Sequence, residues 1–168
     1  MGMRRGKVLK AARKTTKRTA PKAKAKSAAP KVVTQTKVVT KTVEVDRNRA
    51  MRALAQRIVD LTLANDDEGS LALYADNIES REANTPASVG IDAIKQKFAM
   101  WRGMTSSASF TPRSVVAEGN TIVIEWEGRV TLAASGRVAE MNEVAVHEIA
   151  NGKIVKERFY YDPAVLQG

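Results

Sequence analysis

The stretch TIVIEWEGRVTL, residues 121–132, alternates apolar with polar side chains over most of its length. This period of two is typical of a β-strand, in which successive side chains point to opposite faces of a sheet. The same alternation recurs in EMNEVAVHEI, residues 140–149, and the Ser-Gly-Arg sequence at 135–137 predicts a turn between the two stretches. We therefore predict two long strands that pair antiparallel.

A third strand follows directly. The segment ANGK, residues 150–153, predicts a tight hairpin, because Asn and Gly both tolerate the positive φ angles that such a turn needs. The segment KIVKERFYY, residues 153–161, then alternates again and ends at Asp162. This alternation places Phe159 and Tyr161 on one face and Asp162 on the other. The sequence leaves open which face is turned inward.

Helical spacing dominates the chain before these strands. Apolar residues three and four positions apart predict a first helix that Asp46 caps. A short second helix reaches Tyr74, and VGIDAIKQKFAMW, residues 89–101, predicts a third. Between them NIESRE, residues 77–82, reads as a strand. Helices followed by a curved antiparallel sheet predict an α+β fold.

The charge of the chain is divided unevenly. Residues 1–43 hold 14 Lys or Arg and no Asp or Glu, whereas residues 44–168 hold 14 basic and 18 acidic residues. The net charge of +10 therefore belongs to the N-terminal segment, which is rich in Lys, Ala, Thr and Pro. Such a composition predicts a disordered tail, because self-repulsion is strong and little apolar surface can be buried.

The basic tail predicts contact with a polyanion. Its composition resembles the Lys/Ala/Pro-rich tails of linker histones and of histone-like bacterial proteins, which implies nucleic-acid binding. Each basic side chain that neutralises a phosphate releases a counterion, so we expect affinity to fall with salt, and without aromatic residues in the tail we expect little sequence preference. The alternative is a solubilising or targeting extension. The residues expected to contact the polyanion are Arg4, Arg5, Lys7, Lys10, Arg13, Lys14, Lys17, Arg18, Lys22, Lys24 and Lys26.

The segment KVVTQTKVVTKTVEV, residues 31–45, carries a near-repeat of Lys-Val-Val-Thr whose β-branched side chains favour extended backbone. We interpret it as a stiff linker, so that tail and linker occupy residues 1–45 and the folded domain occupies residues 46–168. The absence of Cys excludes disulfides and fits a reducing cytoplasm, where the tail implies association with the nucleoid. No apolar run approaches the ~18 residues that predict a membrane span.

The order of the folded elements resembles a known superfamily. Two helices, YADN at 74–77, VGIDAIKQKF at 89–98, NGKI at 151–154 and YYDPAVL at 160–166 follow one another as in the nuclear transport factor two-like fold. Within that fold the chain is similar to the SnoaL-like polyketide cyclases and the ketosteroid isomerases, over about residues 47–168. The resemblance implies a cone, in which a bent sheet wraps helices around one apolar pocket, and it implies a homodimer.

The same resemblance implies the residues of a site. The general base of the isomerases falls on Glu82, but their two hydrogen-bond donors fall on Ile58 and Ala145, which cannot donate, and this argues against steroid isomerisation. The cyclase pattern places a histidine at His147 and an acid at Asp162. The predicted catalytic residues are thus Glu82, His147 and Asp162. The predicted pocket lining is Ile58, Ile122, Ile124, Trp126, Ala145, Phe159 and Tyr161.

Three functions remain open. The first is a domain that binds a small apolar molecule and is tethered by its cationic tail to nucleic acid or another polyanion. The second is an isomerase, cyclase or hydratase in which Glu82 and His147 transfer a proton. The third is a dimeric architectural protein whose two tails bridge nucleic-acid strands. We expect no cofactor, and a lone histidine with scattered acids does not predict a metal site.

Overall fold

The computed structural model describes the backbone of residues 31–167 and the side chains of residues 43–167. The elements are α1 (Lys31–Ala64), α2 (Asp67–Leu71), β1 (Tyr74–Glu82), β2 (Ser88–Val89), α3 (Ile91–Met104), β3 (Thr105–Glu118), β4 (Thr121–Leu132), β5 (Val138–Ala150), β6 (Lys153–Tyr160) and the short 3-10 helix η1 (Pro163–Leu166). The predicted polyanion contacts, from Arg4 to Lys26, lie outside the described residues.

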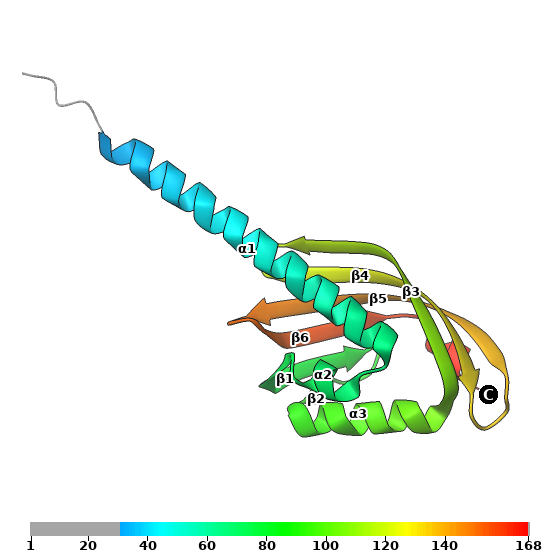
Figure 1. The fold of residues 1–168 in the computed structure, drawn as a ribbon. Helices are drawn as coiled ribbons and strands as arrows, with labels where there is room; N and C mark the ends of the chain where they lie inside the picture. The colour runs from blue at the N-terminus through cyan, green and yellow to red at the C-terminus, as the bar shows by residue number, and fades with distance from the viewer. Residues whose placement is uncertain (1–30, 168) are drawn as a thin grey trace, which may run out of the picture.

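The strands form one six-stranded sheet in the order β2-β1-β6-β5-β4-β3. All neighbouring strands are antiparallel except β1 and β6, which run parallel. Figure 1 shows β3, β4 and β5 bending toward one end of the molecule, with α1 crossing one side of the sheet and α3 lying across the opening below. The predicted α+β fold, with N-terminal helices packed on a strongly curved sheet, is confirmed.

Alternation along β4 decides which side of the sheet is buried. Ile122, Ile124 and Trp126 are at most 4 % exposed, whereas Glu125 and Glu127, on either side of Trp126, are exposed to solvent. Burial of one such apolar side chain contributes about 1.5–3 kcal/mol, so a shift of this strand by one residue would lose several such contributions at once. The strand register is therefore fixed by its own pattern.

The helices complete the core on the side that β4 buries. α1 contributes Met51, Ala55, Ile58 and Val59 to the main cluster, and α3 contributes Ile94, which is fully buried. These residues recur at the three- and four-residue spacing from which the helices were expected. The space that the helices leave beside this cluster becomes the cavity described below.

The hairpin between β5 and β6 is confirmed in detail. Asn151 has φ of 52° and Gly152 has φ of 74°, so both central residues occupy the left-handed region. The flanking residues Ala150 and Lys153 pair across the two strands. The local Asn-Gly sequence therefore sets the register in which the last strand meets its neighbour.

The first helix is longer than predicted. α1 begins at Lys31, so Asp46 does not cap it but lies inside it, where its carboxylate accepts a hydrogen bond from Arg49 at 2.6 Å. The predicted extended backbone of residues 31–45 is therefore wrong. β-branched residues cost a helix less than about 0.7 kcal/mol each, and lengthening an existing helix avoids the cost of nucleation. Figure 1 shows the first turns of α1 extending beyond the sheet.

The structure differs from the prediction for two further elements of the sheet, β1 and β3. Tyr74 begins β1 and does not belong to the second helix, which ends at Leu71. The edge strand β3 was not among the predicted strands, because its Ser and Thr residues dilute the alternation and Pro112 interrupts it. The pairing of β3 with β4 shifts between Pro112 and Ser114, as expected for a proline that cannot donate to the neighbouring strand.

Candidate functional site

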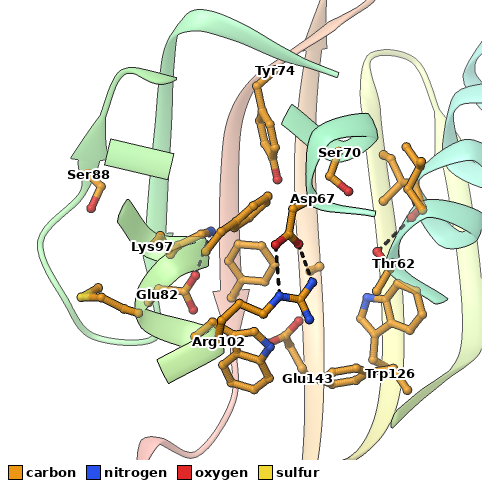
Figure 2. A pocket seen from close by; sticks show the side chains of 18 of the residues that line it. Thr62, Asp67, Ser70, Tyr74, Glu82, Ser88, Lys97, Arg102, Trp126 and Glu143 are labelled. Atoms are coloured by element: carbon orange, nitrogen blue, oxygen red, sulfur yellow. Dashed lines mark hydrogen bonds and ion pairs between the residues drawn. The ribbon is translucent and has the colours of Figure 1, made fainter. Parts of the chain in front are cut away.

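A cavity of about 620 Å³ lies between the buried side of the sheet and helices α1 and α3. Figure 2 shows Glu82 and Lys97 on one side of this space and Trp126 on the other, with Glu143 between them. The apolar part of the wall includes all five Trp and Phe residues of the chain: Phe98, Trp101, Phe110, Trp126 and Phe159. The cavity thus combines an aromatic wall with a small group of charged side chains.

Lys97 on α3 organises the charged side chains. Its ammonium lies 2.6 Å from Glu157 Oε1, 3.0 Å from Glu82 Oε1 and 2.9 Å from Ser80 Oγ. It also lies 4.3 Å from the centre of the Phe159 ring. Burial opposes the charge of Lys97, but the carboxylates of Glu157 and Glu82 together outweigh it and raise the lysine pKa. The lysine is therefore a fixed positive charge in the cavity wall.

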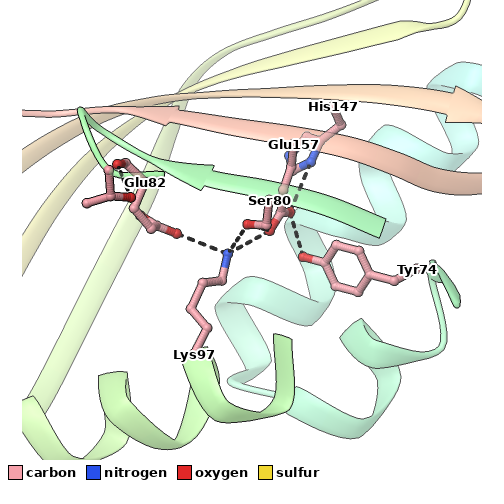
Figure 3. A network of polar contacts seen from close by, with 7 residues as sticks. Tyr74, Ser80, Glu82, Lys97, His147 and Glu157 are labelled. Carbon is pink, nitrogen blue, oxygen red and sulfur yellow. Dashed lines mark hydrogen bonds and ion pairs between the residues drawn. The ribbon is translucent and has the colours of Figure 1, made fainter. Parts of the chain in front are cut away.

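Glu157 on β6 is the most enclosed of the charged groups, with a side chain that is 0 % exposed. Its carboxylate accepts hydrogen bonds from the hydroxyls of Tyr74 at 2.8 Å and Ser80 at 2.7 Å, as Figure 3 shows. Burial acts to raise the pKa of Glu157, but Lys97, His147 and the hydrogen bond from Ser80 lower it overall. Glu157 is therefore ionised at neutral pH.

His147 on β5 lies in the cavity wall beside Glu157. Its Nδ1 atom is 3.7 Å from Glu157 Oε2, which is too long for a hydrogen bond, and it has no partner among the described residues. Burial lowers the pKa of His147 more than the neighbouring carboxylate raises it. The only imidazole of the chain is therefore neutral at pH 7, with an unpaired nitrogen.

Glu82 lies at the end of β1 and lines the cavity, with 31 % of its side chain exposed. It is thus neither a charge on the outer rim nor a free carboxylate, because Lys97 holds it at 3.0 Å. Its strand pairs with β6 so that Glu82 lies opposite Phe159. This pairing brings the end of β1 to the same wall as the aromatic ring.

Glu143 on β5 is the acid that the sequence interpretation missed. It lines the cavity on the same strand face as Ala145 and His147. Burial, and next the negative charge of Glu82, raise the pKa of Glu143 to about 8, although Lys97 acts in the opposite direction. Burial and the same Glu82 charge raise the pKa of Tyr161 to about 12. At neutral pH both side chains therefore carry a proton.

Comparisons with known proteins match this architecture. Residues 55–157 fit the family model of the SnoaL-like domain. This chain belongs to the SnoaL-like family. No curated protein sequence matches the chain. The SnoaL-like assignment covers the cavity-lining part of α1, the whole of α3 and the sheet up to Glu157, and so it includes most of the site.

Solved structures share the fold. A protein of unknown function with this fold from Burkholderia pseudomallei superposes with a TM-score of 0.65 at 18 % identity, over 71 % of this chain and 98 % of that one. A SnoaL-like protein from Mesorhizobium loti, provisionally assigned as a polyketide cyclase, gives 0.57 at 30 % identity, over 66 % and 97 %. TerC, crystallised together with polyporic acid, gives 0.63 at 15 % identity, over 71 % and 99 %.

The SnoaL-like cavity contains most of the predicted lining. Phe159 on β6 and Tyr161, which directly follows this strand, both line the cavity, and this answers the question of register that the sequence left open. Asp162 does not line the cavity; its carboxylate accepts a hydrogen bond from the backbone N–H of Ala164 at 3.0 Å and caps η1. The predicted residues found in the lining are Glu82, His147, Ile58, Trp126, Ala145, Phe159 and Tyr161.

Ile122 and Ile124 belong to the core and do not line the cavity. Both are 0 % exposed and lie in the buried cluster that Met51 and Ala55 of α1 complete. The prediction that they line the pocket is wrong because α1 fills the space in front of this part of the sheet, and the cavity opens only beyond it, near Trp126. Alternation alone distinguishes inward from outward residues but not core from cavity.

Ile124 should therefore contribute to the stability of the fold and not to the binding of a ligand. The substitution Ile124→Ala is expected to lower the free energy of unfolding by about 2–5 kcal/mol, because it removes buried carbon atoms from a packed cluster. Urea unfolding measures this loss. Val116→Ala on the exposed edge strand should stay within about 0.5 kcal/mol of the parent. A loss below about 1 kcal/mol for Ile124→Ala would place this side chain at a cavity surface instead.

Within residues 43–167, no three His, Asp or Glu side chains come together as ligands of a metal ion. No helix of the described part of the chain combines the length and the apolar composition that a membrane crossing requires.

Proposed function

We propose that this SnoaL-like domain binds a small, predominantly apolar molecule in its cavity. The observation that carries the proposal is the open space itself, about 620 Å³ with five Phe and Trp side chains in its wall. That volume lies inside the ~300–1,000 Å³ range of small-molecule sites, whose walls are apolar with a few placed polar groups. TerC, which shares the fold, was crystallised with polyporic acid.

Matched substitutions on one helix test this proposal. Ala93 on α3 lines the cavity, whereas Ala99 on the same helix is exposed. Ala93→Phe is expected to weaken binding of the neutral dye Nile red by about tenfold or more, because a larger side chain takes up the volume the dye needs. Ala99→Phe should leave dye binding unchanged. Dye fluorescence measures both, and thermal unfolding checks that both variants fold.

Equal dye binding by the two variants, or no dye binding by the parent protein, would contradict the proposal that small molecules bind in the cavity. The two tryptophans of the chain, Trp101 and Trp126, both line the cavity and give a second measurement. A molecule that enters the cavity should change the intrinsic fluorescence of the parent protein, whereas a molecule on the outer surface should not.

Proton transfer by Glu82 and His147 is supported less well than binding. A general base is most effective when its pKa lies near the working pH. Burial lowers the pKa of His147 below its ordinary value, and Glu82 is held in an ion pair with Lys97 at 3.0 Å. Ligand binding requires no chemical step, and the cavity alone supports it.

The cationic tail forms the second part of the proposal. Residues 1–43 carry 14 Lys or Arg without any acidic residue, and this composition supports tethering of the domain to nucleic acid or another polyanion. The homodimer that the family resemblance implies, and association with the nucleoid, stay predictions. The tail proposal is independent of the cavity, so each part can fail without the other.

A further inference from the structure

The charges inside the cavity are not balanced. Glu82 and Glu157 both form ion pairs with the single ammonium of Lys97, so one positive charge serves two negative charges. In the rest of the lining, Arg102 pairs with Asp67 at 2.7 Å, and Asp66 accepts a hydrogen bond from the backbone N–H of Gly69 at 2.8 Å. A negative charge without a counterpart is costly in a partly enclosed space. The cavity is therefore prepared for a positive charge that the described residues do not supply.

Two polar groups of the same wall also lack partners. Lys97 engages Glu82 and Glu157 and leaves Glu143 without an ion pair among the described residues. The Nδ1 atom of His147, whose side chain is 4 % exposed, has no hydrogen-bond partner. Both residues project from the same face of β5 into the cavity lining. The half-buried carboxyl group of Glu143 is therefore available to a ligand group in the cavity, whereas the buried nitrogen of His147 faces Glu157.

We infer that the cavity takes a small organic amine, a molecule with a flat apolar body and one protonated amino group. This inference rests on the proposed function and names the class of its ligand. The ammonium has three N–H donors, which suit the oxygens of the Glu143 carboxylate. The aromatic wall favours a cation as well, and Lys97 already lies over the Phe159 ring at 4.3 Å. An anionic ligand would meet uncompensated carboxylates.

Proton exchange should accompany the binding of an amine. The pKa of Glu143 is about 8, so its carboxyl group is mostly protonated at pH 7 when the cavity is empty. A bound ammonium favours the ionised form, so the carboxyl proton leaves to the solvent and an ammonium–carboxylate pair remains. The titratable groups that face Glu143 are Glu82 from β1, Lys97 from α3, His147 from β5, and Glu157 and Tyr161 from β6 and its end. The pKa of His147 lies below its usual value and that of Tyr161 is about 12, so neither takes up this proton near pH 7.

Three probes with one ring system and different charges test the inference. They are 1-naphthylmethylamine, 1-naphthalenemethanol and 1-naphthoate, measured with the full chain by isothermal titration calorimetry at pH 7. We expect the amine to bind about tenfold or more tightly than the alcohol, since one unit of pKa coupling corresponds to a factor of ten, and the carboxylate to bind weakest. Repeating the titration in buffers of different ionisation enthalpy should show close to one proton released per amine bound, and none for the alcohol.

Two variants test whether Glu143 is the residue that causes the preference for the amine and the release of a proton. Glu143→Gln keeps the size of the side chain but cannot ionise, so the preference for the amine and the proton release should both disappear while the alcohol still binds. Glu125→Gln removes the same charge from the outer face of β4 and should change neither result. If the alcohol binds the parent as tightly as the amine, or amine binding releases no proton, the inference is wrong although the proposed function stands. Failure of all three probes together with Nile red would instead contradict the proposed function itself.

Discussion

Replacing Lys97 by methionine is expected to lower the free energy of unfolding by about 3–5 kcal/mol at pH 7, because removal of one partner leaves a buried charge uncompensated. The remaining partner is Glu157, which is 0 % exposed and loses its contact of 2.6 Å. Methionine has nearly the length of the lysine stem, so the change removes charge with little loss of packing. Urea unfolding at pH 7 measures the difference.

The pH dependence of this variant gives an independent signature. In the parent the pKa of Glu157 is lowered, so its contribution to stability is present above the ordinary carboxyl pKa of 4.5 and is lost as the pH falls through the lowered value. Without Lys97, burial dominates and raises the pKa of Glu157. Protonation of Glu157 then removes the buried charge. The difference in the free energy of unfolding between variant and parent should therefore become smaller as the pH falls from 7 to about 5.

A control on the same helix separates charge burial from helix effects. Lys95 is exposed and pairs only with Asp92 one turn away, so Lys95→Met should stay within about 0.5 kcal/mol of the parent. A Lys97→Met variant as stable as Lys95→Met at pH 7 would show that Glu157 takes up a proton or water without cost. The polar network of Figure 3 would then contribute no more to stability than an exposed ion pair does.

Deletion of residues 1–30 is expected to weaken binding to a random-sequence DNA duplex by about 10³-fold or more at low salt, because these residues hold 11 Lys or Arg and no acidic residue. The full chain should itself lose about 10³–10⁵-fold in affinity between 50 and 200 mM salt if six to ten phosphates are contacted. Fluorescence anisotropy of a labelled duplex measures both effects. The deletion leaves α1 intact from its first residue, Lys31.

Tail variants of constant length test the mechanism of this binding. A tail with the same residues in shuffled order should bind as the parent does, since phosphate contacts carry no sequence requirement. A tail with its 11 basic residues replaced by glutamine should behave like the deletion. An unchanged affinity for DNA after the deletion would contradict the proposal that the tail binds a polyanion. It would favour the alternative, a solubilising or targeting extension.

The fold could be predicted largely from local signals. Alternation in residues 121–132 and 153–161, together with the Asn151-Gly152 turn, fixes which strands pair and in which register. The start of α1 could not be predicted in this way, because the β-branched residues 31–45 favour strand on propensity alone. Their helical state depends on continuation of a helix that is stabilised further along by packing from Met51 onward.

The site could be predicted only in part. Lys97 carries a readable signal, since it falls between Ile94 and Trp101 on the face of α3 that turns inward. Glu143 likewise shares the alternation of His147. The protonation of Glu143 could not be read from the sequence, because its raised pKa depends first on burial in the assembled cavity and then on the charges of Glu82 and Glu157, which β1 and β6 bring from distant parts of the chain.

The length of α1 has a consequence for how the two parts of the molecule influence each other. Its first 20 residues, up to Ala50, precede Met51, the first buried residue among the described side chains, and at 1.5 Å per residue they span about 30 Å. Electrostatic interactions in physiological salt decay over ~8 Å. The N-terminal part of α1 therefore acts as a spacer. A phosphate polymer bound at the N-terminal end of this helix would change the electrostatic potential in the cavity very little, and so would hardly affect ligand binding there.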